Sequence, residues 1–154
     1  MANEQQFWID TFEMVDHACL TFYHAPVFED SLEKLNIRYN IEIGIDESHP
    51  GLIVVGTSIE LWVPDTEKSK LIIRSSDQFK YIIRDLDAKI KEKPDSQQKY
   101  IDDHYIVASI IGLAFSTLRG ILIQKLKGTT YQHVILPPFN AFKMAENIMK
   151  EQSA

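Results

Sequence analysis

Hydrophobic and polar residues alternate along the first half of the chain. The clearest case is residues 35–45, where every second position from Ile37 to Ile45 is isoleucine or tyrosine and the positions between are polar or glycine. A two-residue period is typical of a β-strand with one buried face and one face in water. We therefore predict a strand over this segment.

Three other segments, residues 12–23, 52–63 and 70–83, are rich in β-branched and aromatic residues and are also predicted strands. The connections at residues 46–51 and 64–69 are short and contain the residues that favour turns, which is typical of hairpins. Together these segments predict a four-stranded antiparallel sheet whose strands follow one another in sequence order, a meander.

The second half of the chain has a helical pattern. Residues 105–123 contain only four polar side chains, those of Ser109, Ser116, Thr117 and Arg119. We predict a long, mostly buried helix, capped at Asp95 or Ser96 and ended by Gly128. A short helix is expected before it, over residues 82–92.

A short amphipathic helix is predicted at the end of the chain, over residues 140–150. Strands followed by helices indicate the α+β class. A length of 154 residues with 45% hydrophobic residues fits one domain spanning residues 1–154.

One narrow stripe of the long helix is small or polar, because such residues recur at steps of three or four. The other faces are apolar, and a helix that is apolar nearly all round must be covered on nearly all sides. The sheet covers one side, so we expect a second subunit on another. The residues predicted at this subunit interface are Ser109, Gly112, Ser116, Arg119 and Ile123.

A membrane span is the alternative interpretation of residues 105–123, since about 18 consecutive apolar residues suffice to cross a bilayer. Arg119 lies within the segment, with Ser116 and Thr117 at its middle. These polar residues and the charged flanks favour a buried helix, so no membrane insertion is predicted.

Composition and charge exclude several classes of function. The net charge is −6, and nucleic-acid binding needs a basic surface, so no nucleic acid is expected as a partner. The single cysteine, Cys19, allows no internal disulfide and is expected to be a small buried residue. The first ten residues have no basic stretch followed by an apolar run, so a cytoplasmic location is expected.

No motif for catalysis or cofactor binding is present in the sequence. The five histidines lie on separate predicted elements without metal-binding spacing, and neither a glycine-rich phosphate loop nor a nucleophile elbow occurs. Asp102, Asp103 and His104 are adjacent, so on a helix they would point in different directions. We therefore predict no enzyme activity, no metal site and no cofactor.

The order of these elements resembles the SecB family of protein-export chaperones. The most specific part is the long helix with Arg119, the Gly128-Thr129 exit and the Leu136-Pro137-Pro138-Phe139-Asn140 stretch before the last helix. A second similarity is Phe12-x-Met14 leading to a strand that ends at Ala25-Pro26. The resemblance covers residues 12–150.

This resemblance implies a homotetramer, a dimer of dimers packed through the long helices, that holds unfolded polypeptides in apolar grooves without ATP. In the export chaperone, acidic side chains on the first and fourth strands dock the translocation motor ATPase. Leu20, His24 and Arg74 fall near those places in this chain. Because the charge is absent or reversed, docking of the motor ATPase is not expected.

The leading hypothesis is therefore an ATP-independent holdase that binds unfolded polypeptides. Aromatic character and position select five candidate groove residues, which are Tyr39, Trp62, Phe79, Phe139 and Phe142. The alternative is an oligomeric interaction or regulatory module of SecB-like fold without chaperone activity. Exposed apolar area distinguishes the two, because a holdase must display patches larger than those of ordinary monomers.

Overall fold

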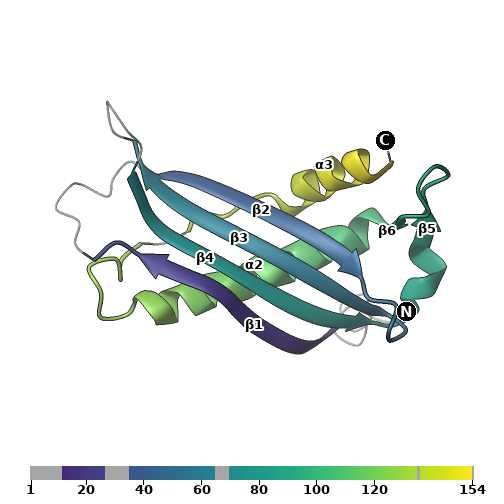
Figure 1. Cartoon of the computed structure of the whole chain (residues 1–154), viewed down its shortest axis with the longest axis horizontal. Helices are drawn as coiled ribbons and strands as arrows, with labels where there is room; N and C mark the ends of the chain where they lie inside the picture. Colours follow the sequence, from purple (N-terminus) through teal and green to yellow (C-terminus); the bar gives the residue numbers. More distant parts are fainter. Residues whose placement is uncertain (1–11, 27–34, 65–69, 135, 154) are drawn as a thin grey trace, which may run out of the picture.

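The computed structural model describes residues 12–26, 35–64, 70–134 and 136–153. A four-stranded antiparallel sheet lies across a long helix, α2, and a shorter helix, α3, follows it (Figure 1). The main elements are β1 (Phe12–His24), β2 (Asn36–Ile45), β3 (Leu52–Val63), β4 (Lys70–Ile83), α2 (His104–Leu126) and α3 (Ala141–Ser153). The predicted α+β class and all four strands are confirmed.

The strand order is β1-β4-β3-β2, so the predicted meander is correct for β2, β3 and β4 and wrong for β1. Short hairpin connections force β2, β3 and β4 to be neighbours, which leaves β1 a choice of two sheet edges. Residues 25–35, between β1 and β2, are numerous enough to span the sheet, because neighbouring strands are only about 4.8 Å apart. The chain therefore crosses to the far edge, and β1 pairs with β4.

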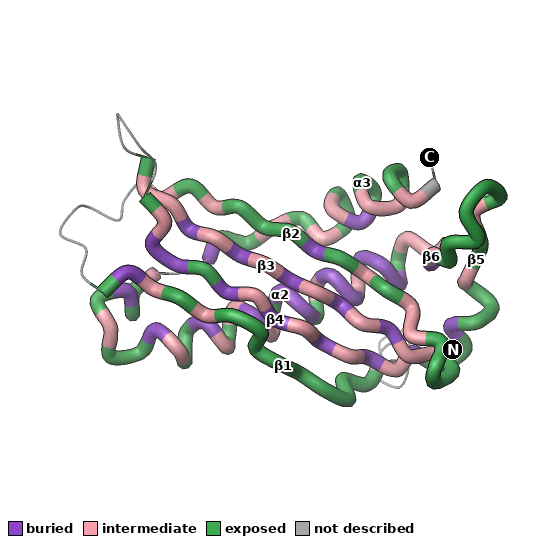
Figure 2. Tube along the Cα trace, in the orientation of Figure 1, coloured by how far each residue is buried: buried purple, intermediate pink, exposed green. Residues whose placement is uncertain are grey.

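Buried and less buried residues alternate along β3 and β4, whereas β1 is exposed over most of its length (Figure 2). The buried side chains of β3 and β4 pair with each other across the ladder, for example Val55 with Phe79 and Leu61 with Ile73. These residues form the inner face of the sheet, which packs against α2.

Strand β1 contains two register shifts, at Val15 and at Leu20, where one residue has no partner on β4. Each extra residue moves the following side chains to the opposite face of the sheet. The first shift places His17 and Cys19 on the inner face, opposite Phe79 and Asp77, and the second returns Phe22 to that face, opposite Ser75. Without the two shifts, Asp16 and Ala18 would face inward in place of His17 and Cys19.

Helix α2 begins later than predicted. Its N-cap is Asp103, whose carboxylate accepts a hydrogen bond from the Ile106 N–H at 3.1 Å, as an N-cap side chain does. The predicted caps Asp95 and Ser96 lie instead in the turn between two short strands, β5 (Ile90–Glu92) and β6 (Lys99–Ile101).

The helix predicted over residues 82–92 is also wrong. Strand β4 runs to Ile83, a four-residue 3₁₀ turn, η1 (Leu86–Lys89), follows, and β5 completes the segment. Pairing of Ile90 with Ile101 buries Ile101 next to the core, and this contact is not visible in the local pattern. The segment is thus a hairpin that carries the chain from the sheet to α2.

The connection between α2 and α3 is fixed by Tyr131, which is buried. Its hydroxyl donates a hydrogen bond to the Ala25 carbonyl at 2.9 Å, and the Ala25 N–H donates to the Ile72 carbonyl. Helix α3 then starts at Ala141 and packs against α2 through buried Ala145. Burial of the tyrosine ring and this bond hold the connection against the end of the sheet.

By length and composition α2 could cross a membrane. Half of its most apolar window, however, is buried inside the chain, where Ile110, Ile111 and Leu118 are fully buried. Core helices of soluble proteins have this character, and the packing observed is that of a core helix.

Candidate functional site

Three aromatic rings from separate elements meet at the side of the sheet formed by β2. Tyr39 of β2 lies edge-on to Phe115 of α2, with ring centroids 5.7 Å apart, and the Phe115 ring lies 4.3 Å from that of Phe139. Tyr39 and Phe139 are 6.4 Å apart. Phe115 is buried, Phe139 is half-buried and Tyr39 is 40% exposed, so the cluster extends from the core to the surface.

Strand β2 lies at an edge of the sheet, and within the described residues no strand pairs with its outer side. A hollow of about 490 Å³ lies between α3 and the β2 side of the sheet and reaches residues of β3 and β4. Ile41, Ile43 and Ile148 line it together with polar side chains, among them those of Glu42, Glu151 and Gln152. Tyr39 precedes these isoleucines on the same face of β2. The aromatic cluster and the hollow thus follow one another along β2. We call the two together the β2 groove and define it by Tyr39, Ile41, Ile43, Phe115, Phe139 and Ile148.

An exposed strand edge offers unpaired backbone N–H and C=O groups, to which an extended peptide adds as a further strand. The β2 groove places apolar side chains beside such an edge. Its geometry suits an extended segment whose alternate side chains are apolar, with the backbone paired to β2 and one side chain directed to the aromatic rings.

The structure brings together two of the five predicted groove residues, Tyr39 and Phe139. Phe79 is 0% exposed and lies in the core between His17 and Tyr81, so it is not accessible to a bound peptide. Phe142 is exposed, but it lies against His104 and Tyr105 near the start of α2.

Trp62 lies on the outer face of the sheet, away from the β2 groove. Its indole N–H donates to the Glu60 carboxylate at 2.9 Å, Arg74 forms an ion pair with the same carboxylate, and the Arg38 guanidinium lies 5.3 Å from the indole ring. The Trp62 hydrogen bond, followed by that of Arg74, lowers the pKa of Glu60. Trp62 is thus part of a charged network, with its polar group already bonded.

Sequence reasoning missed Phe115, the residue that joins Tyr39 to Phe139. It lies in the apolar helix segment, where its pattern is that of any core residue. Only its contacts with two other elements distinguish it, and these depend on the position of α2 against β2.

The five predicted interface residues of α2 are all on the sides of the helix that the sheet leaves uncovered. Ser116 and Ile123 are exposed, whereas Ser109, Gly112 and Arg119 are half-buried. Exposed Tyr105 and Leu113 lie on the same helix side. This surface combines small residues with large apolar ones.

A buried polar cluster lies on the inner face of the sheet. Asp77 is fully buried, and its carboxylate accepts a hydrogen bond from the Ser75 hydroxyl at 2.7 Å and lies 3.0 Å from the His17 Nε2. Serine and histidine both contact the carboxylate, so the serine–histidine bond that activates a nucleophile is missing from this cluster. Its arrangement is that of a satisfied buried carboxylate that links β1 to β4.

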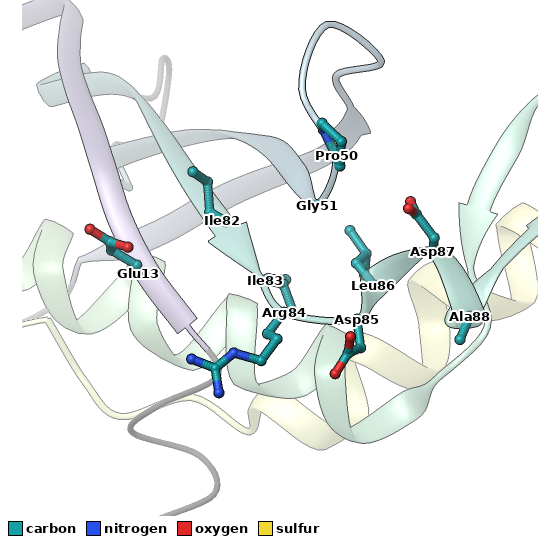
Figure 3. Close-up of a pocket in the computed structure, with 10 residues that line it drawn as sticks. All are labelled: Glu13, Pro50, Gly51, Ile82, Ile83, Arg84, Asp85, Leu86, Asp87 and Ala88. Atoms are coloured by element: carbon teal, nitrogen blue, oxygen red, sulfur yellow. The ribbon is translucent and has the colours of Figure 1, made fainter.

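A second hollow, of about 510 Å³, lies at the end of the sheet where β4 leads into η1 (Figure 3). Glu13, Asp85 and Asp87 bring carboxylates to its walls, but the side chains in Figure 3 point in different directions. Within the described residues no group of three or more potential ligands is placed to hold a metal ion. This hollow offers no convergent set of polar groups.

No protein-family model and no curated protein sequence matches the chain. Among solved structures, the chain is similar to the Mycobacterium tuberculosis Rv1957 SecB-like chaperone in complex with a ChAD peptide from the Rv1956 HigA1 antitoxin. The similarity covers 86% of this chain and 93% of that chain, with a TM-score of 0.57 and 8% sequence identity. The fold is SecB-like.

The SecB-like fold confirms the architecture that the resemblance implied: a four-stranded antiparallel sheet, a long helix and a short last helix. At 8% sequence identity, this similarity shows the fold and carries no evidence of function. The function of this SecB-like chain must therefore be argued from its own β2 groove.

Proposed function

We propose that the chain, as one SecB-like domain over residues 1–154, is an ATP-independent chaperone that binds extended segments of unfolded polypeptides in the β2 groove. The observation that carries the proposal is the exposed Tyr39 ring, which packs on Phe115 and Phe139 beside β2, the edge strand of the sheet that the structure describes. An aromatic ring at a sheet edge offers apolar contact and backbone pairing together.

The solved structural neighbour supports this assignment, because that SecB-like chaperone was determined with a bound peptide. A chaperone role also agrees with the chemistry of the described residues. Their polar clusters are bonded internally, and the aromatic part of the groove, formed by Tyr39, Phe115 and Phe139, offers apolar contact, with polar side chains such as Glu42 and Glu151 beside Ile41 and Ile43 in the hollow. We propose no catalytic step, cofactor or metal for this function.

Self-association and a cytoplasmic location belong to the same proposal. Tyr105, Leu113 and Ile123 display apolar surface on the side of α2 that faces away from the sheet, and a second copy of the chain would cover it. Docking of the translocation motor ATPase is not part of the proposal. Arg74, near one of the docking positions, carries positive charge and is paired with Glu60.

The proposal is tested by fluorescence anisotropy of a labelled, permanently unfolded polypeptide titrated with the protein. Tyr39→Ala is expected to weaken binding about tenfold, because it removes the exposed ring of the groove (about 1.4 kcal/mol). Tyr23→Ala is the matched control, since Tyr23 is similarly exposed but lies on β1 at the opposite sheet edge. It should bind like the wild type.

Equal loss in both variants would contradict a role for the β2 groove. Absence of saturable binding to the unfolded polypeptide by the wild-type protein would overturn the chaperone proposal. The alternative, an oligomeric interaction or regulatory module, would then be the better hypothesis.

A further inference from the structure

Residues 136–140 form a strap that leads to the start of α3 at Ala141, which Figure 1 shows beside β2. The strap contacts the β2 groove through Phe139, whose ring lies against those of Phe115 and Tyr39. Its Leu136 is buried and its Phe139 is half-buried. Phe139 makes the closest aromatic contact of the cluster, with its ring centroid 4.3 Å from that of Phe115. The strap thus places one of the chain's own aromatic rings in the part of the groove that an apolar client side chain would enter.

Side chains hold the strap in place. Pro137 and Pro138 have no backbone N–H to donate, and within the described residues no backbone hydrogen bond joins positions 136–139 to the sheet. A segment attached only through apolar contacts is released without breaking a hydrogen-bond ladder. An apolar side chain of a bound polypeptide could make the same contacts in place of the strap.

Both ends of the strap are fixed independently of Phe139. On one side, the buried Tyr131 hydroxyl donates to the Ala25 carbonyl. On the other, the Asn140 side chain accepts a hydrogen bond from the Lys143 N–H at 3.0 Å and its carbonyl accepts from the Met144 N–H, which caps α3. Displacement of Phe139 therefore requires neither end of the connection to unfold.

We propose that Phe139 is an internal competitor, a residue that fills the aromatic part of the β2 groove and is displaced when a client binds. This inference rests on the proposed chaperone function and adds its regulation. The closed strap reduces the fraction of molecules ready to bind, and the apparent dissociation constant rises by the inverse of that fraction. Tyr39 and Phe115 then form the wall that contacts the client, whereas Phe139 competes with the client for the same space.

Opposite effects of two truncations test the proposal in the anisotropy assay. Phe139→Ala is expected to tighten binding of the unfolded polypeptide about tenfold and to raise the association rate, whereas Tyr39→Ala weakens binding. Phe142→Ala is the matched control, because Phe142 is a nearby phenylalanine that contacts His104 and Tyr105 instead of the groove. Its affinity should equal that of the wild type.

A second readout does not depend on removing the ring. In Phe139→Trp the indole would replace the phenylalanine against Phe115, and its fluorescence is compared with that of the wild type, which contains Trp8 and Trp62. Addition of polypeptide should shift the extra emission to longer wavelength, because the displaced indole enters water. An unchanged or blue-shifted emission at saturation would show that the ring stays in the groove and would overturn the proposal.

The failure of this inference differs from the failure of the chaperone function. If the wild type binds and folded Phe139→Ala binds equally or more weakly, Phe139 is not a competitor and the function stands. If circular dichroism shows that Phe139→Ala is unfolded, the emission shift of Phe139→Trp alone decides whether Phe139 is displaced. If neither the wild type nor Phe139→Ala binds polypeptide, both proposals fail.

Discussion

Both sides of α2 carry large apolar side chains, but the surroundings of these side chains are opposite. On the sheet side, Ile110, Ile111 and Leu118 are fully buried. On the far side, Leu113 and Ile123 are exposed next to small residues. An apolar pattern therefore predicts that a residue is buried, but it does not predict whether the same chain or another molecule buries it.

The two sides of α2 are therefore expected to serve different purposes, one the stability of the folded chain and the other its association with a second molecule. Side chains on the sheet side hold the helix to the chain's own core, so their loss should unfold the protein. The large apolar side chains on the far side, Leu113 and Ile123, are only partly covered by the described residues. Their loss should therefore affect mainly contacts with another molecule. The predictions below test this division.

The largest effect is expected from Leu118→Ala. Truncation of a fully buried leucine removes apolar contacts and leaves a cavity, so the free energy of unfolding should fall by about 2–5 kcal/mol. Ile123→Ala is the matched control, a truncation of similar size at a side chain that is 55% exposed, and it should change the free energy of unfolding of the dissociated chain by less than about 0.5 kcal/mol. Denaturant unfolding at low protein concentration measures both values. Similar losses in the two variants would show that the far side is also part of the monomer core.

Strands β2, β3 and β4 could be predicted from the sequence because β2 and β3 alternate along their length and β4 alternates from Ile73 to Ile83. The pattern of β1 is broken, because the unpaired residues at Val15 and Leu20 change its phase twice. A local period cannot reveal such shifts, since they are fixed by pairing with β4. For the same reason the sequence did not predict that β1 joins β4.

The groove was only partly predictable for a related reason. Aromatic character selected Tyr39 and Phe139 correctly as neighbours, but it also selected Phe79 and Trp62, which the sheet directs to the core and to the outer face. Phe115 was missed because a groove residue at the base of a cluster has the same pattern as a core residue. Which aromatics share a surface depends on strand register and helix position, and both are tertiary properties.

A smaller effect, on the sheet side, is expected at Tyr81. Its buried hydroxyl makes no hydrogen bond of ordinary geometry within the described residues, and the nearby Thr117 hydroxyl, which interacts with it, already donates to the Leu113 carbonyl. A buried polar group that is poorly satisfied is destabilising. Tyr81→Phe should therefore raise the free energy of unfolding near neutral pH by about 1 kcal/mol. Denaturant unfolding at pH 7 measures this change, and a loss of stability would show that the hydroxyl is bonded in solution.

The same residue predicts a dependence on pH. Burial raises the pKa of Tyr81 from 10.0 to about 12, so the folded protein keeps this proton at a pH where the unfolded chain loses it. Its contribution to stability is complete below pH 10 and falls as the pH rises towards 12. In Tyr81→Phe, the free energy of unfolding should therefore decrease less between pH 10 and pH 12 than in the wild type. An ultraviolet titration of tyrosine in the folded protein, wild type against Tyr81→Phe, should show the absence of one late-titrating group.

The smallest effect on the chain itself, and the sharpest test of the far side of α2, is expected from Gly112→Ala. An added Cβ meets no atom within 4 Å, and alanine is favoured over glycine inside a helix, so the free energy of unfolding of the dissociated chain should rise by about 0.5–1 kcal/mol. If a second copy packs its helix closely against this side, the same methyl group should separate the two helices and weaken association. Light scattering over a dilution series should then show dissociation at a higher concentration than for the wild type. Gly120→Ala, about two turns further along an equally open stretch, repeats the test. A rise in the free energy of unfolding without any change in the molar mass measured over the dilution series would show that no helix approaches this side closely. The exposed Leu113 and Ile123 would then have to be covered by a different partner.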